Sequence, residues 1–227
     1  MPEEVAEALS RFGTSILADA MERLNIQLRN QGFTKPGLHC FDDRCASIAG
    51  FAGTARIRTS DPSITGQPFY RHPDWWDEIN RLPRPRIVVI EDIDHPAGMG
   101  ASIGQVGAAM FGALDCKGAI TNGSVRDAGV SSRMGFSMFG AHQSPSHSYA
   151  HLVEHSVPVE IFGLKINPGD LLVADRHGLL AVPPGLAQRL CAEAEEVRRR
   201  KEVFVEYCKS PRFAVGELEE KLKELRQ

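Results

Sequence analysis

The sequence predicts an α/β fold with a parallel sheet, and three observations near its middle carry that prediction. Residues 86–92 form an apolar, β-branched run typical of a buried strand, and residues 119–122 form a second short run. Between them lie a glycine-rich turn at 98–104 and a helix of small residues at 106–114. Strand, loop, helix and strand in this order make a βαβ unit, whose crossover favours parallel pairing.

The sequence ahead of this unit predicts two short helices and another strand. Apolar residues recur at helical spacing through residues 3–24, and the break at Gly13-Thr14-Ser15 divides that stretch in two. Residues 50–59 alternate small or apolar side chains with polar ones, which is typical of a strand. Residues 61–85 are rich in proline, so we expect a surface excursion, with a short helix at 75–80 whose tryptophan pair serves packing or a subunit contact.

The last part of the chain predicts short strands followed by a helical tail. Asp175 precedes a turn, so we expect it to bond local amides. The tail has an apolar stripe but is highly charged, and we expect it on the surface or against another subunit. We therefore predict a single domain over residues 1–227, with a helical extension from about 186 to 227. The strands are expected at 137–139, 159–162, 171–175 and 179–182, and the tail helices at 186–208 and 216–226.

The composition argues against several classes of protein. The 227 residues carry 26 Lys+Arg against 29 Asp+Glu, a net charge of −3, so no broad positive field is available for a nucleic acid backbone. No apolar run has the length of a bilayer, and the acidic N-terminus lacks a basic-then-apolar signal. We therefore expect a cytoplasmic protein that binds neither nucleic acid nor membranes.

The cysteines fit the same expectation. Their number is odd, and their spacing matches neither a C-x-x-C pair nor a zinc finger. We expect reduced thiols, with a redox or ligand pair at Cys40 and Cys45 as the alternative. The five are Cys40, Cys45, Cys116, Cys191 and Cys208.

Two loops are expected to line one crevice. Ligands of parallel α/β sheets gather at the carboxyl ends of the strands, where the glycine loop and the loop after residue 122 both lie. Arg126 can hold a carboxylate through two hydrogen bonds, and Asp127 can bind a hard divalent cation. Taken alone, an Arg-Asp pair or a glycine loop is more often structural, but the combination favours a site. Anion-binding main-chain groups are expected at Gly104, Gln105, Val106 and Gly107.

These motifs resemble a known family. The run Asn122–Asp127, with Gly104-Gln105 upstream and Asn167–Pro183 downstream, is similar to the 4-hydroxy-4-methyl-2-oxoglutarate aldolase family, which also contains the regulator of ribonuclease E activity A. Residues 15–20 are similar to the opening helix of the family, so the resemblance covers most of the chain. It is weakest at 61–85.

The resemblance implies a β/β/α swivelling-type fold in trimers or hexamers, with active sites between subunits. It also implies metal-assisted retro-aldol cleavage that releases pyruvate from a 4-hydroxy-2-oxo acid. Arg126 would bind the pyruvyl carboxylate together with the amides around Gln105, Val106 and Gly107, and Asp127 would ligate Mg²⁺ or Mn²⁺. A metal-bound water would take the hydroxyl proton, and oxaloacetate decarboxylation is expected as a side activity because it passes through the same enolate.

Two departures from the family pattern keep an alternative open. Family aldolases commonly carry a carboxylate where this chain has Gln105, so metal affinity or proton transfer is altered. In the family, a second acidic group comes from the tail of a neighbouring subunit. The candidates for it here are Glu202, Glu206 and Glu217, and the alternative for each is an ordinary solvated charge on a helix. The alternative is a non-catalytic regulator that binds a protein partner such as a ribonuclease.

Four histidines crowd the stretch from residue 141 to 155. On a helix, His147, His151 and His155 would share one face and form a metal patch. The loop-like residues 143–146 favour instead histidines of a loop or interface near the substrate mouth, His142 included.

Overall fold

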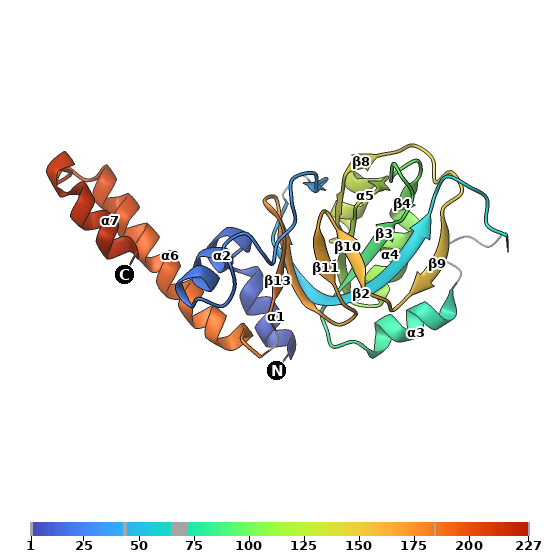
Figure 1. The fold of residues 1–227 in the computed structure, drawn as a ribbon, viewed down its shortest axis with the longest axis horizontal. Coiled ribbons are helices and arrows are strands. Elements are labelled where there is room, and N and C mark those ends of the chain that lie inside the picture. The colour runs from blue at the N-terminus through green and yellow to red at the C-terminus, as the bar shows by residue number, and fades with distance from the viewer. Residues whose placement is uncertain (1, 43–44, 65–71, 184, 227) are drawn as a thin grey trace.

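The computed structural model describes residues 2–42, 45–64, 72–183 and 185–226, and its centre is one mixed sheet (Figure 1). The strands β2, β3, β5 and β7 run parallel to one another, which confirms the predicted crossover between residues 86 and 122. In spatial order the sheet holds β1 (His39–Cys40), β7 (Ser137–Gly140), β5 (Cys116–Thr121), β3 (Arg86–Asp92), β2 (Ile48–Arg58), β12 (Leu171–Asp175) and β13 (Gly178–Val182), with β9 (His151–His155) paired to β2.

Two small sheets accompany the large one. The hairpin of β10 (Val159–Ile161) and β11 (Leu164–Ile166) is antiparallel. The strands β4 (Ala101–Ile103), β6 (Ser124–Val125) and β8 (His142–Gln143) form a three-stranded parallel sheet. Because β4 and β6 follow the loops after β3 and β5, this sheet joins the two loops expected to form the site.

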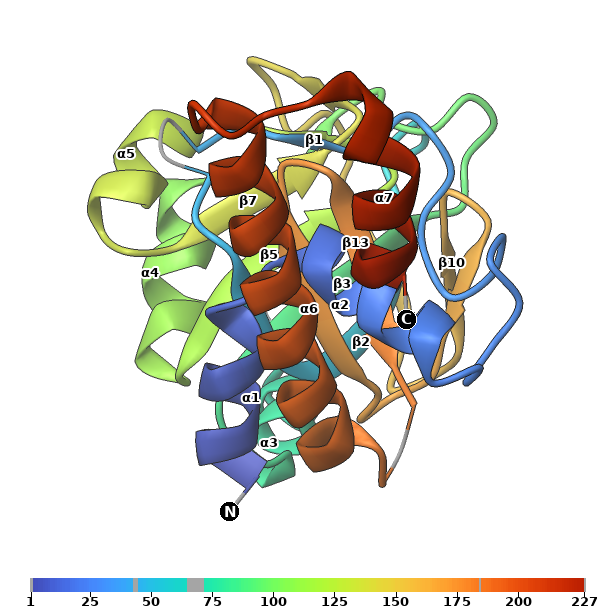
Figure 2. The same ribbon diagram turned by 90° about the vertical axis from the view of Figure 1, so that its left-hand side faces the viewer.

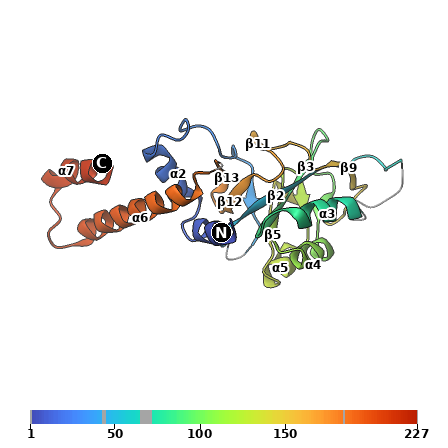
Figure 3. The ribbon, with the colours of Figure 1, turned by 90° about the horizontal axis from the view of Figure 1, so that it is seen from below.

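Helices cover the sheet and extend beyond it. The two opening helices lie against α6, while α4 and α5 lie together on another side (Figures 2 and 3). The division at Gly13 and the two tail segments agree with the sequence. The helices are α1 (Pro2–Ser10), α2 (Thr14–Arg23), α3 (Pro73–Arg81), α4 (Gln105–Ala113), α5 (Ala128–Arg133), α6 (Ala187–Lys209), the 3₁₀ turn η1 (Val215–Glu217) and α7 (Leu218–Arg226).

The buried apolar residues explain how these layers hold together. Trp75 is fully buried and meets Phe111 of α4 edge to face, with ring centroids 5.2 Å apart. On the opposite side, Leu9, Leu17 and Leu190 join α1, α2 and α6 over the β12–β13 hairpin. The packing role expected for the tryptophan pair is therefore confirmed for Trp75, whereas residues 65–71 of the same stretch lie outside the described residues.

The cysteine expectation was wrong for one pair. Cys40 and Cys45 form a disulfide with their Cα atoms 6.0 Å apart, whereas Cys116, Cys191 and Cys208 are thiols. The Cys45 N–H donates to the Asp42 carbonyl at 3.1 Å, and the two cysteine side chains lie within bridging distance. No helix in the described ranges is long and apolar enough to cross a membrane.

Candidate functional site

The loops after β3 and β5 are tied together at their first residues. The Asp92 N–H donates to Asn122 Oδ1 at 2.7 Å, and Asn122 Nδ2 donates to the Asp92 carbonyl at 2.9 Å. This reciprocal pair sits where the two parallel strands end. The side-chain amide of Asn122 therefore adds one more pair of hydrogen bonds beyond the last strand residues and fixes the first residue of each loop.

Two buried carboxylates bind the segments beside the end of β3, Asp92 the glycine-rich loop and Asp94 the residues that follow β2. Asp92 Oδ2 accepts hydrogen bonds from Thr59 Oγ1 at 2.9 Å and from the Gly98 N–H at 2.7 Å. Asp94 accepts from the backbone N–H groups of Thr59 and Ser60 at 2.7 and 2.8 Å. Burial opposes ionisation of Asp94, but these donors hold its pKa below the ordinary value. These framework carboxylates carried no motif, so sequence reasoning missed them.

The small parallel sheet delivers the predicted residues to one place. Ile103 of β4 pairs with Val125 of β6, and the Arg126 N–H donates to the Ile103 carbonyl at 3.0 Å. Gly104 follows β4 directly and precedes α4. A Cβ built on Gly104 would lie 2.9 Å from Arg126 Cγ and 3.0 Å from Asp127 Oδ2. Glycine is therefore what allows the two loops to approach this closely.

Asp127 faces the start of α4 rather than its own helix. Its backbone has φ of 56°, in the left-handed region, and its carbonyl accepts from Ser131 Oγ at 3.0 Å. The carboxylate oxygen Oδ2 accepts from Arg126 Nε at 3.2 Å and from the Gln105 N–H at 3.3 Å. The αL backbone and the bonds to α5 thus turn the side chain toward Arg126 and the positive end of α4.

A pocket of about 130 Å³ lies at this junction. The residues that the sequence placed in the two converging loops all line it, so the structure brings these two loops together as expected. Sequence reasoning placed His147 near the substrate mouth without a role, and the structure adds it to the wall. The lining consists of Gly104, Gln105, Val106, Gly107, Arg126, Asp127 and His147.

The other histidines do not form the helical metal patch. His151 and His155 lie on strand β9 and His142 lies on β8. Their four-residue spacing therefore does not place them on one face of a helix. The loop interpretation of this stretch is the correct one for His147. It lies between β8 and β9.

The pocket contains side-chain oxygen atoms of the kind that a hard divalent cation prefers. Among the described residues there is no group of three or more His, Cys, Asp or Glu side chains placed to hold a metal. Asp127 is the acidic side chain among the lining residues, accompanied by the neutral amide of Gln105. Such a set suits Mg²⁺, which commonly keeps several waters and binds through one or two carboxylates and substrate oxygens.

The acidic candidates of the tail lie elsewhere within one chain. α6 and α7 occupy the opposite end of the molecule from α4 (Figure 1). Glu217 accepts a hydrogen bond from Tyr207 at 3.0 Å, and Glu206 pairs with Lys209 at 3.8 Å, whereas Glu202 is an exposed residue of α6. A role for these side chains at the pocket therefore requires a second copy of the chain.

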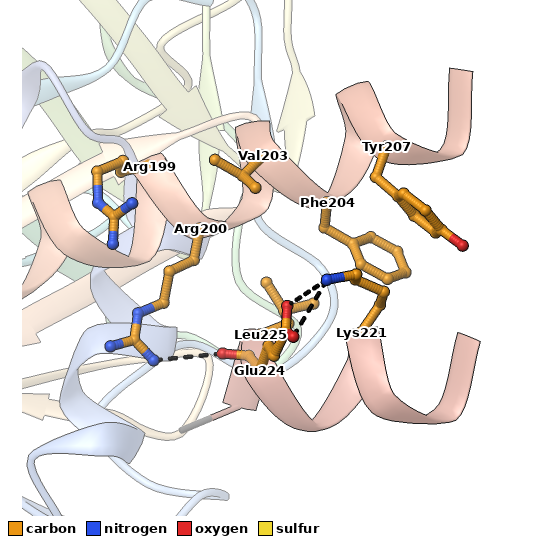
Figure 4. A pocket seen from close by; sticks show the side chains of 8 residues that line it. All are labelled: Arg199, Arg200, Val203, Phe204, Tyr207, Lys221, Glu224 and Leu225. Atoms are coloured by element: carbon orange, nitrogen blue, oxygen red, sulfur yellow. Dashed lines mark hydrogen bonds and ion pairs between the residues drawn. The ribbon is translucent and has the colours of Figure 1, made fainter. Parts of the chain in front are cut away.

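A larger cavity of about 500 Å³ lies between α6 and α7 (Figure 4). Its charges are satisfied locally, since Lys221 donates to Glu224 and Arg200 donates to the Glu224 carbonyl at 3.4 Å. It lies far from the strand ends. Arg199 is paired with Glu196 as well, so none of the cationic groups among the described lining residues is free to recognise a small acid.

Comparisons with known proteins give a matching family and proteins of similar fold. A family model described as RraA-like, Aldolase/RraA, matches residues 14–181. Protein DlpA of Legionella pneumophila is 23% identical over 134 residues, which cover 55% of this chain and 20% of that protein. The chain thus spans about a fifth of the length of that curated relative.

Solved structures share the fold at low sequence identity. A crystal structure described as novel cellulases from microbes associated with the gut ecosystem has a TM-score of 0.71 at 23% identity, covering 88% of this chain and 86% of that one. RraAS2 of Streptomyces coelicolor, described as an unusual member of the RNase ES inhibitor RraA protein family, has a TM-score of 0.67 at 19% identity. That match covers 88% of this chain and 94% of RraAS2.

Proposed function

The chain belongs to the RraA-like, Aldolase/RraA family, and on that premise we propose that it is a divalent-metal-dependent lyase that releases pyruvate from a 4-hydroxy-2-oxo acid. The observation that carries this proposal is the convergence of Arg126, Asp127 and the start of α4 on one small pocket. The pocket volume lies below the roughly 300–1,000 Å³ of sites for drug-sized ligands, which suits a small acid.

The carboxylate of the substrate is bound by Arg126 and by main-chain donors. The first intrahelical bond of α4 runs from the Ala108 N–H to the Gly104 carbonyl at 2.9 Å, so the N–H groups of Val106 and Gly107 precede it and remain available for an anion. Asp127 holds Arg126 through Nε. The terminal guanidinium nitrogens are then free to form the two parallel hydrogen bonds that a carboxylate accepts.

The same groups support the cleavage step. Breaking the bond between C3 and C4 leaves negative charge on the pyruvate enolate, and the positive charge of Arg126 beside the bound acid stabilises it. When bound at Asp127, Mg²⁺ or Mn²⁺ supplies Lewis-acid polarisation of the keto oxygen. Oxaloacetate yields the same enolate by loss of carbon dioxide, which makes its decarboxylation the expected side activity.

Pyruvate release tests the proposal. The purified chain is assayed with 4-hydroxy-4-methyl-2-oxoglutarate and with oxaloacetate, in Mg²⁺, in Mn²⁺ and in chelator. We expect metal-dependent turnover that falls about 10²–10³-fold in Arg126→Ala, the usual cost of removing one charge-stabilising donor, and falls also in Asp127→Ala. Arg133→Ala is the matched control, because Arg133 ends α5 outside the pocket lining. Failure of the wild-type chain to release pyruvate from either acid would refute the proposal.

A second function is favoured by one residue. Gln105 brings a neutral amide to a position where the resemblance leads us to expect a carboxylate, and the neighbour RraAS2 is described as belonging to an inhibitor family. We propose a non-catalytic regulator of a ribonuclease as the alternative. Purified RNase E mixed with the chain tests it: saturable inhibition together with no pyruvate release would favour the regulator.

We also propose that the chain forms a homotrimer or homohexamer with its pockets at subunit boundaries. The pocket offers one carboxylate, and the tail carries acidic residues that cannot reach it within one chain. Light scattering during size-exclusion chromatography measures the mass. A monomer that retains full lyase activity would contradict shared sites.

A further inference from the structure

We propose that His147, in place of the metal-bound water that the resemblance implies, is the proton acceptor for the 4-hydroxyl of the substrate, an inference that rests on the lyase function proposed above. His147 lines the same pocket as Arg126 and Asp127, although it comes from a different loop. The other lining side chains do not offer an equivalent group: the guanidinium is already protonated, the carboxylate is bonded to two donors, and the amide of Gln105 does not accept a proton at neutral pH.

The tautomer of His147 follows from its anchor. Its Nδ1 lies 2.7 Å from the carbonyl oxygen of Ala101. A carbonyl can only accept, so Nδ1 carries the hydrogen, and in the neutral form of the ring the lone pair therefore lies on Nε2. This is the arrangement of a histidine base whose second nitrogen is oriented by a hydrogen bond.

The backbone around His147 is fixed as firmly as its ring. The Ala101 N–H donates to the Ser146 carbonyl at 2.8 Å, and the Ala150 N–H donates to the His147 carbonyl at 3.0 Å. A Cβ on Gly100 would overlap the His147 carbonyl oxygen, so the glycine permits this close approach. The imidazole is therefore held against β4, which leads directly to Gly104 and the start of α4.

The proton transfers balance without any further reactant. Nε2 takes the proton of the 4-hydroxyl, the electron pair of that O–H bond forms the new carbonyl at C4, and the pair of the C3–C4 bond moves into the pyruvate enolate. The imidazolium then gives its proton to water, and the enolate takes a proton at C3 from water. Oxaloacetate has no 4-hydroxyl, so its decarboxylation does not need this base.

The test is therefore the ratio of two activities in His147→Asn. The side-chain amide of asparagine can still donate to Ala101 but has no ring nitrogen to accept the proton. We expect the ratio of aldol cleavage to oxaloacetate decarboxylation to fall by about 10²-fold or more, within the usual contribution of general base catalysis, with KM for both acids little changed. Added imidazole is expected to restore part of the cleavage in His147→Ala.

His151→Asn is the matched control. His151 also has Nδ1 on a carbonyl, that of Tyr149 at 2.8 Å, but it does not line the pocket. The ratio of the two activities is expected to stay at the wild-type value in this variant. A wild-type ratio in His147→Asn, or an equal loss of both activities, would overturn the role of His147 while leaving the lyase intact. Absence of both activities in the wild-type chain would instead remove the proposed function and this inference with it.

Discussion

At the scale of single residues, the site depends on a glycine at position 104. Gly104 lets Arg126 and Asp127 lie against the start of α4, and a methyl group there would come within 2.9 Å of Arg126 Cγ. We expect Gly104→Ala to push the guanidinium out of place and to lower pyruvate affinity and turnover together. Isothermal titration with pyruvate measures the first effect and the pyruvate-release assay measures the second.

Gly112 of the same helix supplies the control for that variant. Apart from its chain neighbours and the backbone of its own helix, no described atom lies within 4 Å of a Cβ built at Gly112. Gly112→Ala should leave pyruvate binding unchanged and raise the unfolding free energy by about 0.5–1 kcal/mol, because alanine favours a helix interior. If Gly104→Ala bound pyruvate as the wild type does, close contact between these loops would not matter for the site.

At the scale of elements, Asp175 links a strand of the sheet to the second helix. Its Oδ2 accepts from the Thr14 N–H at 2.7 Å and its Oδ1 from Thr14 Oγ1 at 2.7 Å, so a residue far along the chain caps α2. The local bond expected from the sequence is also present, since the His177 N–H donates to Oδ1 at 2.9 Å. We expect Asp175→Asn to lower the unfolding free energy by about 1–3 kcal/mol at pH 7.

The same carboxylate predicts a pH dependence. Burial works against its ionisation, but the hydrogen bonds from Thr14 and His177 outweigh burial and hold the pKa of Asp175 below its ordinary 3.8. A carboxyl with a lowered folded-state pKa stabilises the fold above the unfolded value and loses that effect as pH falls through the folded value. Urea unfolding should therefore show the gap between wild type and Asp175→Asn closing below pH 3.8. A gap that stays constant down to pH 2 would contradict this cap, and exposed Asp61→Asn is the control.

Some elements of this fold could be predicted from local sequence patterns, and others could not. Residues 86–92 and 106–114 carry their own β-branched and small-residue patterns, so the crossover and the convergence of Gly104 with Arg126 could be predicted locally. The three-stranded sheet could not, because β6 and β8 have two residues each and show no period. The position of the His147 ring depends on a hydrogen bond to Ala101, 46 residues away, and that of Asp92 depends on hydrogen bonds to three separate segments. The Cys40–Cys45 disulfide was not predicted because the number and spacing of the cysteines do not show which two side chains lie within bridging distance.

At the scale of the whole molecule, the C-terminal helices α6 and α7 contact the rest of the protein mainly through the first half of α6. Leu190, Ala194 and Val197 of α6 are buried against the opening helices. Farther along, Val203 is 60% exposed, and α6 packs with α7 as a projecting hairpin (Figure 1). Aromatic contact between Tyr207 and Phe213, with centroids 5.9 Å apart, stabilises the hairpin internally. Truncating a buried side chain in the first half of α6 should therefore change the unfolding free energy more than truncating an exposed side chain in its second half.

Leu190→Ala and Val203→Ala compare the two halves of α6 directly. Leu190 is fully buried, so its truncation leaves a cavity between α6 and the opening helices and should lower the unfolding free energy by about 2–5 kcal/mol. Val203 is largely exposed within one chain, so in a monomer its truncation should change that free energy by less than about 0.5 kcal/mol. Denaturant unfolding of each variant followed by circular dichroism gives both values. If Val203→Ala destabilised the chain as much as Leu190→Ala, the outer half of α6 would have to be packed against another surface in solution, and a concentration-dependent midpoint would identify that surface as a second copy.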